Sequence, residues 1–199
     1  MNINQYIKKG TLSISNLISL EKVSEDDIWE IISTAIELKN KRIVHETLSV
    51  LKNKYVLLIT KPSLPRLDIT FQIAIKELSG VPVKTLMDGE HLENTLSDRQ
   101  YIKALSACGV SAVAVCTSKC SDSEIFKNNL SVPIINSSEI HSPCEALSTL
   151  MTIIELCHKL SGVNVTLVGN LNNLDNSLLI GLVKLGANVT ILPSENGLP

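Results

Sequence analysis

Short apolar runs alternate with helical patterns along most of the chain, and this alternation constrains the fold more than any other feature. The run YVLLIT at residues 55–60 is continuously apolar and too short for a helix, which predicts a strand covered on both faces. Similar runs predict strands at residues 81–86, 111–117 and 132–136. Because helical patterns separate these runs, we expect an α/β fold with a parallel sheet flanked by helices.

Cap residues and apolar spacing predict where the first helices begin and end. Ser24 is followed by three acidic residues, a pattern typical of a helix start, and apolar residues then recur at helical spacing across residues 28–36. Phe71 and Ile75 lie on the apolar face of a later helix, which Gly80 is predicted to end.

Two further helix starts are predicted from capping patterns. Ser121 with Glu124 forms a capping box. Ser142, Pro143 and Glu145 form a stronger signal, with a serine cap, a proline at the first helical position and a glutamate at the third.

A second, smaller unit is predicted near the C-terminus. A strand at residues 163–169, a helix at about 173–185 and a strand at 188–193 follow each other. Three elements hardly bury both faces of a sheet. We therefore expect a first domain at residues 1–160 and an incomplete second domain at residues 161–199.

Composition excludes several classes of protein. Of the 199 residues, 44% are hydrophobic and 19% are charged, so the chain is too apolar to be disordered. A formal net charge of -2 gives no electrostatic reason to expect nucleic acid or a membrane surface as a partner. The sequence shows neither a secretory signal nor an apolar segment of spanning length. We expect a soluble cytoplasmic protein.

The cysteines do not predict a structural site. Their number is odd and they form no Cys-x-x-Cys pair, which favours reduced, partly buried thiols over disulfides or zinc. We expect neither a bound metal ion nor a cofactor. The five cysteines are Cys108, Cys116, Cys120, Cys144 and Cys157.

Several segments occur in an order shared with one enzyme family. They are VGNLNNLDNSLLIGLVKLG at residues 168–186, GEHLENT at 89–95, VPIIN at 132–136 and PCEAL at 143–147. From about residue 11 to its end, the chain resembles the carbamoyltransferases of the aspartate and ornithine type, and residues 168–186 resemble the ornithine branch.

The resemblance implies two parallel-sheet domains with an active site between them. The first domain would bind carbamoyl phosphate, a small anion, and the second an amino acid. The family reaction transfers a carbamoyl group from carbamoyl phosphate to an amino-acid amine. The resemblance also implies a homo-oligomer, a trimer built mainly through the first domain.

The phosphate-binding turn departs from the family pattern. In the family a Ser-Thr-Arg-Thr-Arg turn holds the phosphate, and here Ser63 and Arg66 carry over while Leu64 stands in the place of a threonine. Pro65 has no N–H, and Asp68 would place a negative charge near a dianion. As an alternative, Asp68 is interpreted as a helix cap.

The other expected substrate contacts are also altered. The family's arginine on the third strand corresponds to Cys116, and a thiol does not replace a guanidinium. The His and Gln expected at the carbonyl group fall on Ser142 and Glu145, with His141 displaced by one position. On the amino-acid side, Asn173 resembles a family asparagine.

Three functions remain open. The first is a family member whose phosphate site has decayed and which has little or no activity as this chain. The second is an active carbamoyltransferase, or a fragment of one, with an atypical site around Ser63, Arg66 and His141. The third is a noncatalytic regulatory or assembly subunit. We assign no catalytic residue.

Overall fold

The computed structural model describes residues 11–60, 65–86, 96–117, 120–138, 142–169 and 176–193. The chain divides into two compact units. The sheet unit comprises residues 15–18 and 39–139, and the terminal unit comprises residues 1–14, 19–38 and 140–199. The domain boundary predicted at residue 161 concerns the family's functional division and stays a prediction. None of the described helices is long and apolar enough to cross a membrane.

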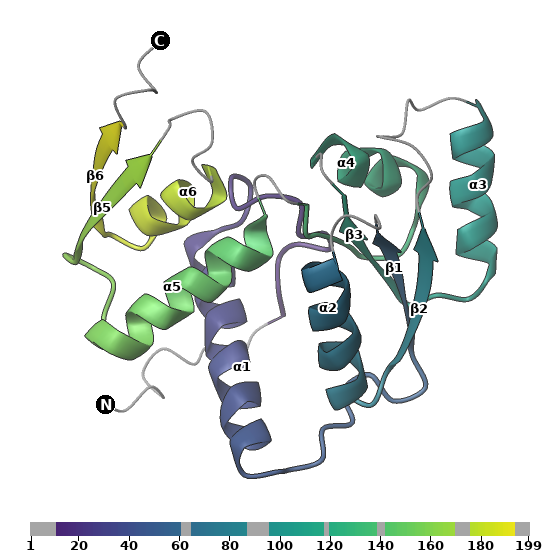
Figure 1. The fold of residues 1–199 in the computed structure, drawn as a ribbon, viewed down its shortest axis with the longest axis horizontal. Coiled ribbons are helices and arrows are strands. Elements are labelled where there is room, and N and C mark those ends of the chain that lie inside the picture. Colours follow the sequence, from purple (N-terminus) through teal and green to yellow (C-terminus); the bar gives the residue numbers. More distant parts are fainter. Residues whose placement is uncertain are drawn as a thin grey trace. The chain divides into compact units, whose positions relative to one another are not determined.

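A parallel sheet of four strands forms the centre of the sheet unit (Figure 1). Its strands are β1 (Tyr55–Thr60), β2 (Val81–Leu86), β3 (Ala112–Cys116) and β4 (Ile134–Asn136), in the spatial order β2-β1-β3-β4. The predicted parallel sheet is therefore confirmed. The fourth strand is shorter than predicted and begins after Pro133, whose carbonyl accepts a hydrogen bond of 2.9 Å from the Val113 N–H.

Helices cover both faces of this sheet. On one face, α2 (Pro65–Glu77) packs Ile75 and Phe71 against the inner positions of β1 and β3. On the other face, α3 (Leu96–Ala107) and α4 (Cys120–Asn129) contribute Ile102 and Phe126.

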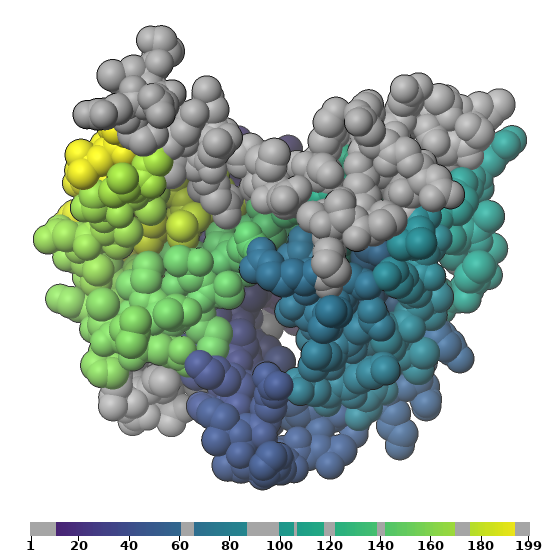
Figure 2. Space-filling model, viewed as in Figure 1, coloured from purple at the N-terminus to yellow at the C-terminus, as the bar shows by residue number. Residues whose placement is uncertain are grey.

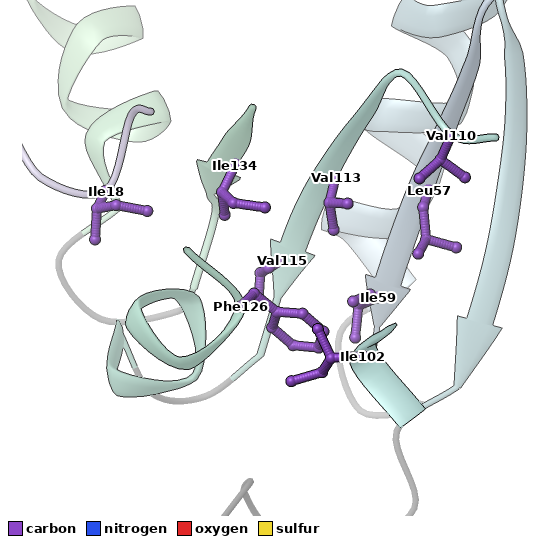
Figure 3. Packing of buried hydrophobic residues seen from close by; sticks show 9 residues of the cluster. All are labelled: Ile18, Leu57, Ile59, Ile102, Val110, Val113, Val115, Phe126 and Ile134. Atoms are coloured by element: carbon purple, nitrogen blue, oxygen red, sulfur yellow. The ribbon is translucent and has the colours of Figure 1, made fainter. Parts of the chain in front are cut away.

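The larger apolar cluster lies under α3 and α4. Figure 3 shows Phe126 and Ile102 lying against Ile59 and Val115. Burial of each such side chain contributes roughly 1.5 to 3 kcal/mol, so this cluster accounts for much of the unit's stability. Its buried members are Ile18, Leu57, Ile59, Ile102, Val110, Val113, Val115, Phe126 and Ile134.

Gly80 takes part in closing the end of α2, as predicted. The left-handed residue is Ser79, with φ of 64°, and not Gly80. The Gly80 N–H donates to the Ile75 carbonyl at 2.8 Å and closes the helix end. A Cβ atom at position 80 would lie 2.9 Å from side-chain atoms of Ile75 and Leu51, so glycine is required by space and not by backbone conformation.

The two later helix starts have opposite outcomes. The capping box at Ser121 is wrong, because α4 begins at Cys120 and Ser121 is already inside the helix. The prediction at α5 (Pro143–Cys157) is confirmed: Ser142 is the cap and its hydroxyl accepts a hydrogen bond from the Glu145 N–H at 3.4 Å.

The terminal unit combines three helices with a small sheet. Strands β5 (Asn164–Gly169) and β6 (Asn188–Pro193) pair in parallel, and α6 (Asn176–Lys184) connects them. The unit also contains most of α1 (Glu25–Ile43). The two strands remain largely at the surface (Figure 2), where Val168 is 70% and Leu192 51% exposed.

Close packing and a lysine join α6 to the rest of the terminal unit. A Cβ atom at Gly181 would lie 2.7 Å from a side-chain carbon of Leu150, so α5 and α6 meet at a glycine. The Lys184 ammonium donates to the carbonyls of Leu20, Glu21 and Val23 at 2.9, 2.7 and 2.6 Å. All three of its N–H groups are thereby used.

Asp27 ties the start of α1 to the segment before it. Its carboxylate accepts hydrogen bonds from the Ser13 hydroxyl, from the Ser13 N–H at 2.9 Å and from the Ser24 hydroxyl at 2.8 Å. These bonds, those from Ser13 foremost, hold the pKa of the Asp27 carboxyl below its usual value, although burial acts in the opposite direction.

We predict that Asp27→Asn lowers the free energy of unfolding by about 1 to 3 kcal/mol at neutral pH, because charge-assisted hydrogen bonds are lost. The carboxyl pKa is lowered on folding, so this difference is present above the ordinary pKa of about 3.9 and disappears as the pH falls through the folded-state value. Urea denaturation of the wild type and the variant at pH 7 and at pH 3 measures the stability difference and its decrease at low pH. Glu25→Gln, in the same helical turn, is the control, and an equal loss in both variants would contradict the prediction.

Candidate functional site

The carboxyl edge of the four-stranded sheet is the candidate site. The chain passes from β1 outward to β2, returns to β3 and continues to β4, so the direction of strand order reverses between β1 and β3. In open α/β sheets, ligands bind outside the carboxyl ends of the strands at this reversal. The predicted phosphate turn follows β1 at this edge. Its residues Ser63 and Leu64 lie outside the described residues.

Arg66 lies in the first turn of the helix that follows this edge. It is the second residue of α2, is exposed, and its carbonyl accepts a hydrogen bond of 2.8 Å from the Thr70 hydroxyl. The first turn of a helix presents N–H groups that favour anions, but Pro65, the first helical residue, has no backbone N–H.

Asp68 forms an ion pair that was not expected from the sequence. Its carboxylate accepts hydrogen bonds from the Lys84 ammonium of β2 at 2.5 Å and from the Gln72 amide at 2.9 Å. The Asp68 side chain is only 10% exposed, whereas that of Lys84 is 41% exposed. Asp68 is the fourth helical residue, so its interpretation as a cap is wrong. The Lys84 ammonium is thus bound to this carboxylate.

Three uncharged side chains form a row across the ends of neighbouring strands. Thr60 pairs with Cys116 in the sheet register, and Ser137 follows in line because its N–H donates to the Val115 carbonyl at 2.9 Å. Residues in register on parallel strands face the same side of the sheet. That side is covered by α2, since Cys116 packs with Leu67.

Cys116 therefore occupies a buried position where the family resemblance places an arginine. All three residues of the row are buried. Within the part of the chain that the structure describes, the hydroxyls of Thr60 and Ser137 have no hydrogen-bond partner. Buried hydroxyls without partners are unusual, which marks this edge as a polar site.

The opposite face of the same edge is closed by Asn136. Its amide oxygen accepts hydrogen bonds from the Ser123 hydroxyl at 2.9 Å and from the Ser138 N–H at 3.0 Å. Its amide nitrogen donates to the Ile18 carbonyl at 2.9 Å. Asn136 thus holds α4 and the chain before α1 at the end of β4, which is a structural role.

The start of α5 carries the only other predicted site residue that the structure describes. Glu145 is half-buried in the first turn, and its carbonyl accepts hydrogen bonds from the hydroxyls of Ser148 and Thr149. His141 and Asn173 lie outside the described residues. Glu145 belongs to the terminal unit and Arg66 to the sheet unit, so their convergence on one ligand stays a prediction.

Sequence reasoning missed three residues of this edge. The sequence does not indicate a role for Lys84, because its partner Asp68 is sixteen positions away and is brought close only by the pairing of β1 with β2. Thr60 and Ser137 could have been found, since each is a polar residue at the end of a predicted buried strand. In the described ranges, no group of three His, Cys, Asp or Glu residues could hold a metal ion.

Comparison with known proteins identifies the same family as the sequence motifs. A family model described as aspartate/ornithine carbamoyltransferase, carbamoyl-P binding domain, matches residues 15–155. The chain is 34% identical over 182 residues to an ornithine carbamoyltransferase of Methanococcus aeolicus, covering 90% of this chain and 58% of that protein. It is 33% identical to the ornithine carbamoyltransferase of Methanocaldococcus jannaschii, over 86% of this chain and 55% of the relative.

Solved structures agree with these relatives. Ornithine carbamoyltransferase from Pyrococcus furiosus superposes with a TM-score of 0.84 at 29% identity, over 96% of this chain and 61% of that one. The catalytic subunit of aspartate transcarbamoylase from M. jannaschii shares the fold, with a TM-score of 0.80 at 22% identity, over 94% of this chain and 63% of that one. The chain thus spans less than two thirds of the length of these relatives.

We predict that Thr60→Val raises the free energy of unfolding by about 1 kcal/mol, because it removes a buried hydroxyl without a partner and keeps the side-chain shape. Thr70→Val is the control, since the Thr70 hydroxyl is exposed and hydrogen-bonded. Urea denaturation of both variants measures the difference. A loss of stability in Thr60→Val would mean that the hydroxyl is satisfied in solution, for example by a bound water molecule.

Proposed function

Because the chain belongs to the aspartate/ornithine carbamoyltransferase family, we propose that it is a member whose phosphate site has decayed and which has little or no transfer activity as this chain. The proposal concerns the substrates of the family, which are carbamoyl phosphate and an amino acid. The observation that carries it is the charge at the sheet edge: a buried thiol replaces the expected arginine, and Asp68 engages Lys84.

Carbamoyl transfer makes strong demands on this edge. An amine attacks the carbonyl carbon of carbamoyl phosphate, and phosphate leaves with the electrons of the broken C–O bond. The transition state needs cationic and N–H donors at the phosphate and further donors at the carbonyl oxygen. Thr60 and Ser137 can donate hydrogen bonds but bring no positive charge. A dianion would be bound weakly there.

The magnitude follows from the number of lost contacts. A charge-assisted hydrogen bond is worth roughly 1.5 to 3 kcal/mol, so the loss of three weakens binding by about a thousandfold or more. Arg66 remains as a cation at the turn. A single exposed guanidinium does not replace the lost charge-assisted hydrogen bonds, because exposed ion pairs contribute only about 0 to 1 kcal/mol.

The carbonyl and amino-acid contacts are also reduced in this proposal. Glu145 occupies the place of a family glutamine, and a carboxylate cannot donate to a carbonyl oxygen. Asn173 is the residue proposed to face the amino acid. We infer from the family a homo-oligomer, a trimer built mainly through the predicted first domain at residues 1–160. The net charge of -2 gives no reason to propose nucleic acid or a membrane as a partner.

We predict that isothermal titration of the protein with carbamoyl phosphate gives no saturable heat at millimolar ligand. The reason is that the described residues of the sheet edge bring too little positive charge to offset a dianion's desolvation. Arg66→Ala would then change nothing measurable. Binding in the micromolar range that Arg66→Ala abolishes would contradict the proposal and indicate a working carbamoyltransferase site of atypical composition.

A variant that gains affinity tests the electrostatic cause directly. Asp68→Asn removes the carboxylate that holds Lys84, and we predict that affinity for inorganic phosphate rises roughly tenfold, or ~1.4 kcal/mol. The matched control is Glu77→Gln at the other end of α2, which changes the net charge equally but breaks a pair with Arg42. An equal rise in phosphate affinity in both variants would show only an effect of net charge. If the affinity of Asp68→Asn does not rise, the pairing of Lys84 with Asp68 is not the cause of weak binding.

A further inference from the structure

A cavity of about 340 Å³ lies within the terminal unit, where the first turns of α1 meet the ends of α5 and α6. Buried Ile154, Leu160 and Leu185 line it, together with the half-buried indole of Trp29. Ligand pockets of proteins begin at about 300 Å³ and are mostly apolar with a few polar groups. This volume and lining suit a ligand with one ring.

The charged residues of the lining carry an excess of positive charge. Lys159 and Lys184 line the cavity, with one acidic residue, Glu25, and with His158. The Lys184 ammonium is held by three backbone carbonyls, so its charge is fixed in place and is not neutralised by them. An anion is therefore favoured over a cation of the same shape.

The backbone at the end of α5 holds this wall in a defined position. His158 adopts the left-handed conformation, with φ of 59°, and its N–H donates to the Ile154 carbonyl at 2.8 Å. Beyond it, the Gly162 N–H donates to the Gly186 carbonyl at 2.8 Å, which joins the turn after α5 to the turn after α6. The cavity is thus bounded by hydrogen-bonded turns.

We propose that this cavity is a binding site for a small organic carboxylate with an apolar, single-ring body. The ring lies against Trp29 and the aliphatic side chains, since offset stacking on an indole is favourable. The carboxylate points toward Lys159 and the fixed charge of Lys184. The site is separate from the sheet edge, because every residue of its lining belongs to the terminal unit, and it does not depend on the proposed function.

The single tryptophan of the chain makes the proposal directly testable, because Trp29 lines the cavity. Tryptophan fluorescence of the full chain is titrated with phenylacetate, 2-phenylethanol and phenethylamine, which share a ring and differ in charge. We expect a saturable change with phenylacetate and an apparent affinity at least several-fold weaker for the other two. No saturable change, or equal affinity for all three probes, would overturn the proposal.

Variants separate binding in the cavity from binding elsewhere. Lys159→Gln should weaken the affinity for phenylacetate by about two- to fivefold, which is the range expected for a partly exposed ion pair. Lys103→Gln, an exposed lysine of α3 in the other unit, should leave the affinity unchanged. Ser161→Leu places a larger side chain in the lining and should abolish the saturable change, with circular dichroism confirming the fold. Unaltered binding in Ser161→Leu would refute the site.

Discussion

The parallel pairing of β1 with β3 is the constraint on which the sheet unit depends. It aligns Val56 to Thr60 with Ala112 to Cys116 and divides their side chains between α2 on one face and α3 with α4 on the other. The same register brings Thr60 beside Cys116 at the point where strand order reverses. The pairing that builds the core therefore also fixes which side chains meet at the candidate site.

The apolar core and the polar edge make separate demands on the sequence. The core requires apolar side chains at inner strand positions, and residues such as Leu58 and Val115 meet this demand irrespective of the side chains at the strand ends. The edge requires positive charge for a dianion, and there Cys116 is a buried thiol and Asp68 engages Lys84. The residues that determine the fold are thus different from those that would bind a phosphate, so the two can change independently.

Local patterns predicted the fold well, whereas the site depends on contacts that local patterns do not contain. The run from Tyr55 to Thr60 became a strand with the predicted bounds, because its length and continuous apolarity leave few alternatives. Gly80 closes α2 as predicted, but the crowding by Leu51 that requires a glycine there arises from a distant segment. The partner of Asp68 was missed for the same reason, since Lys84 reaches it only through strand pairing. The family resemblance, and not periodicity, predicted that the turn after β1 is the phosphate site.

The terminal unit is held together in a different way from the sheet unit. Its two strands leave Val168 and Leu192 exposed, so strand packing contributes little to its core. Its core lies instead among the helices, where Ile28, Leu150 and Leu182 are fully buried. The close contact at Gly181 and the Lys184 ammonium, bound by three carbonyls, add to this packing. Such polar contacts fix geometry more than they add free energy, because each net hydrogen bond is worth only about 1 kcal/mol. A cavity beside this core, bounded by such contacts, keeps its shape, and a fixed shape lowers the cost of ordering the protein's side chains when a ligand binds.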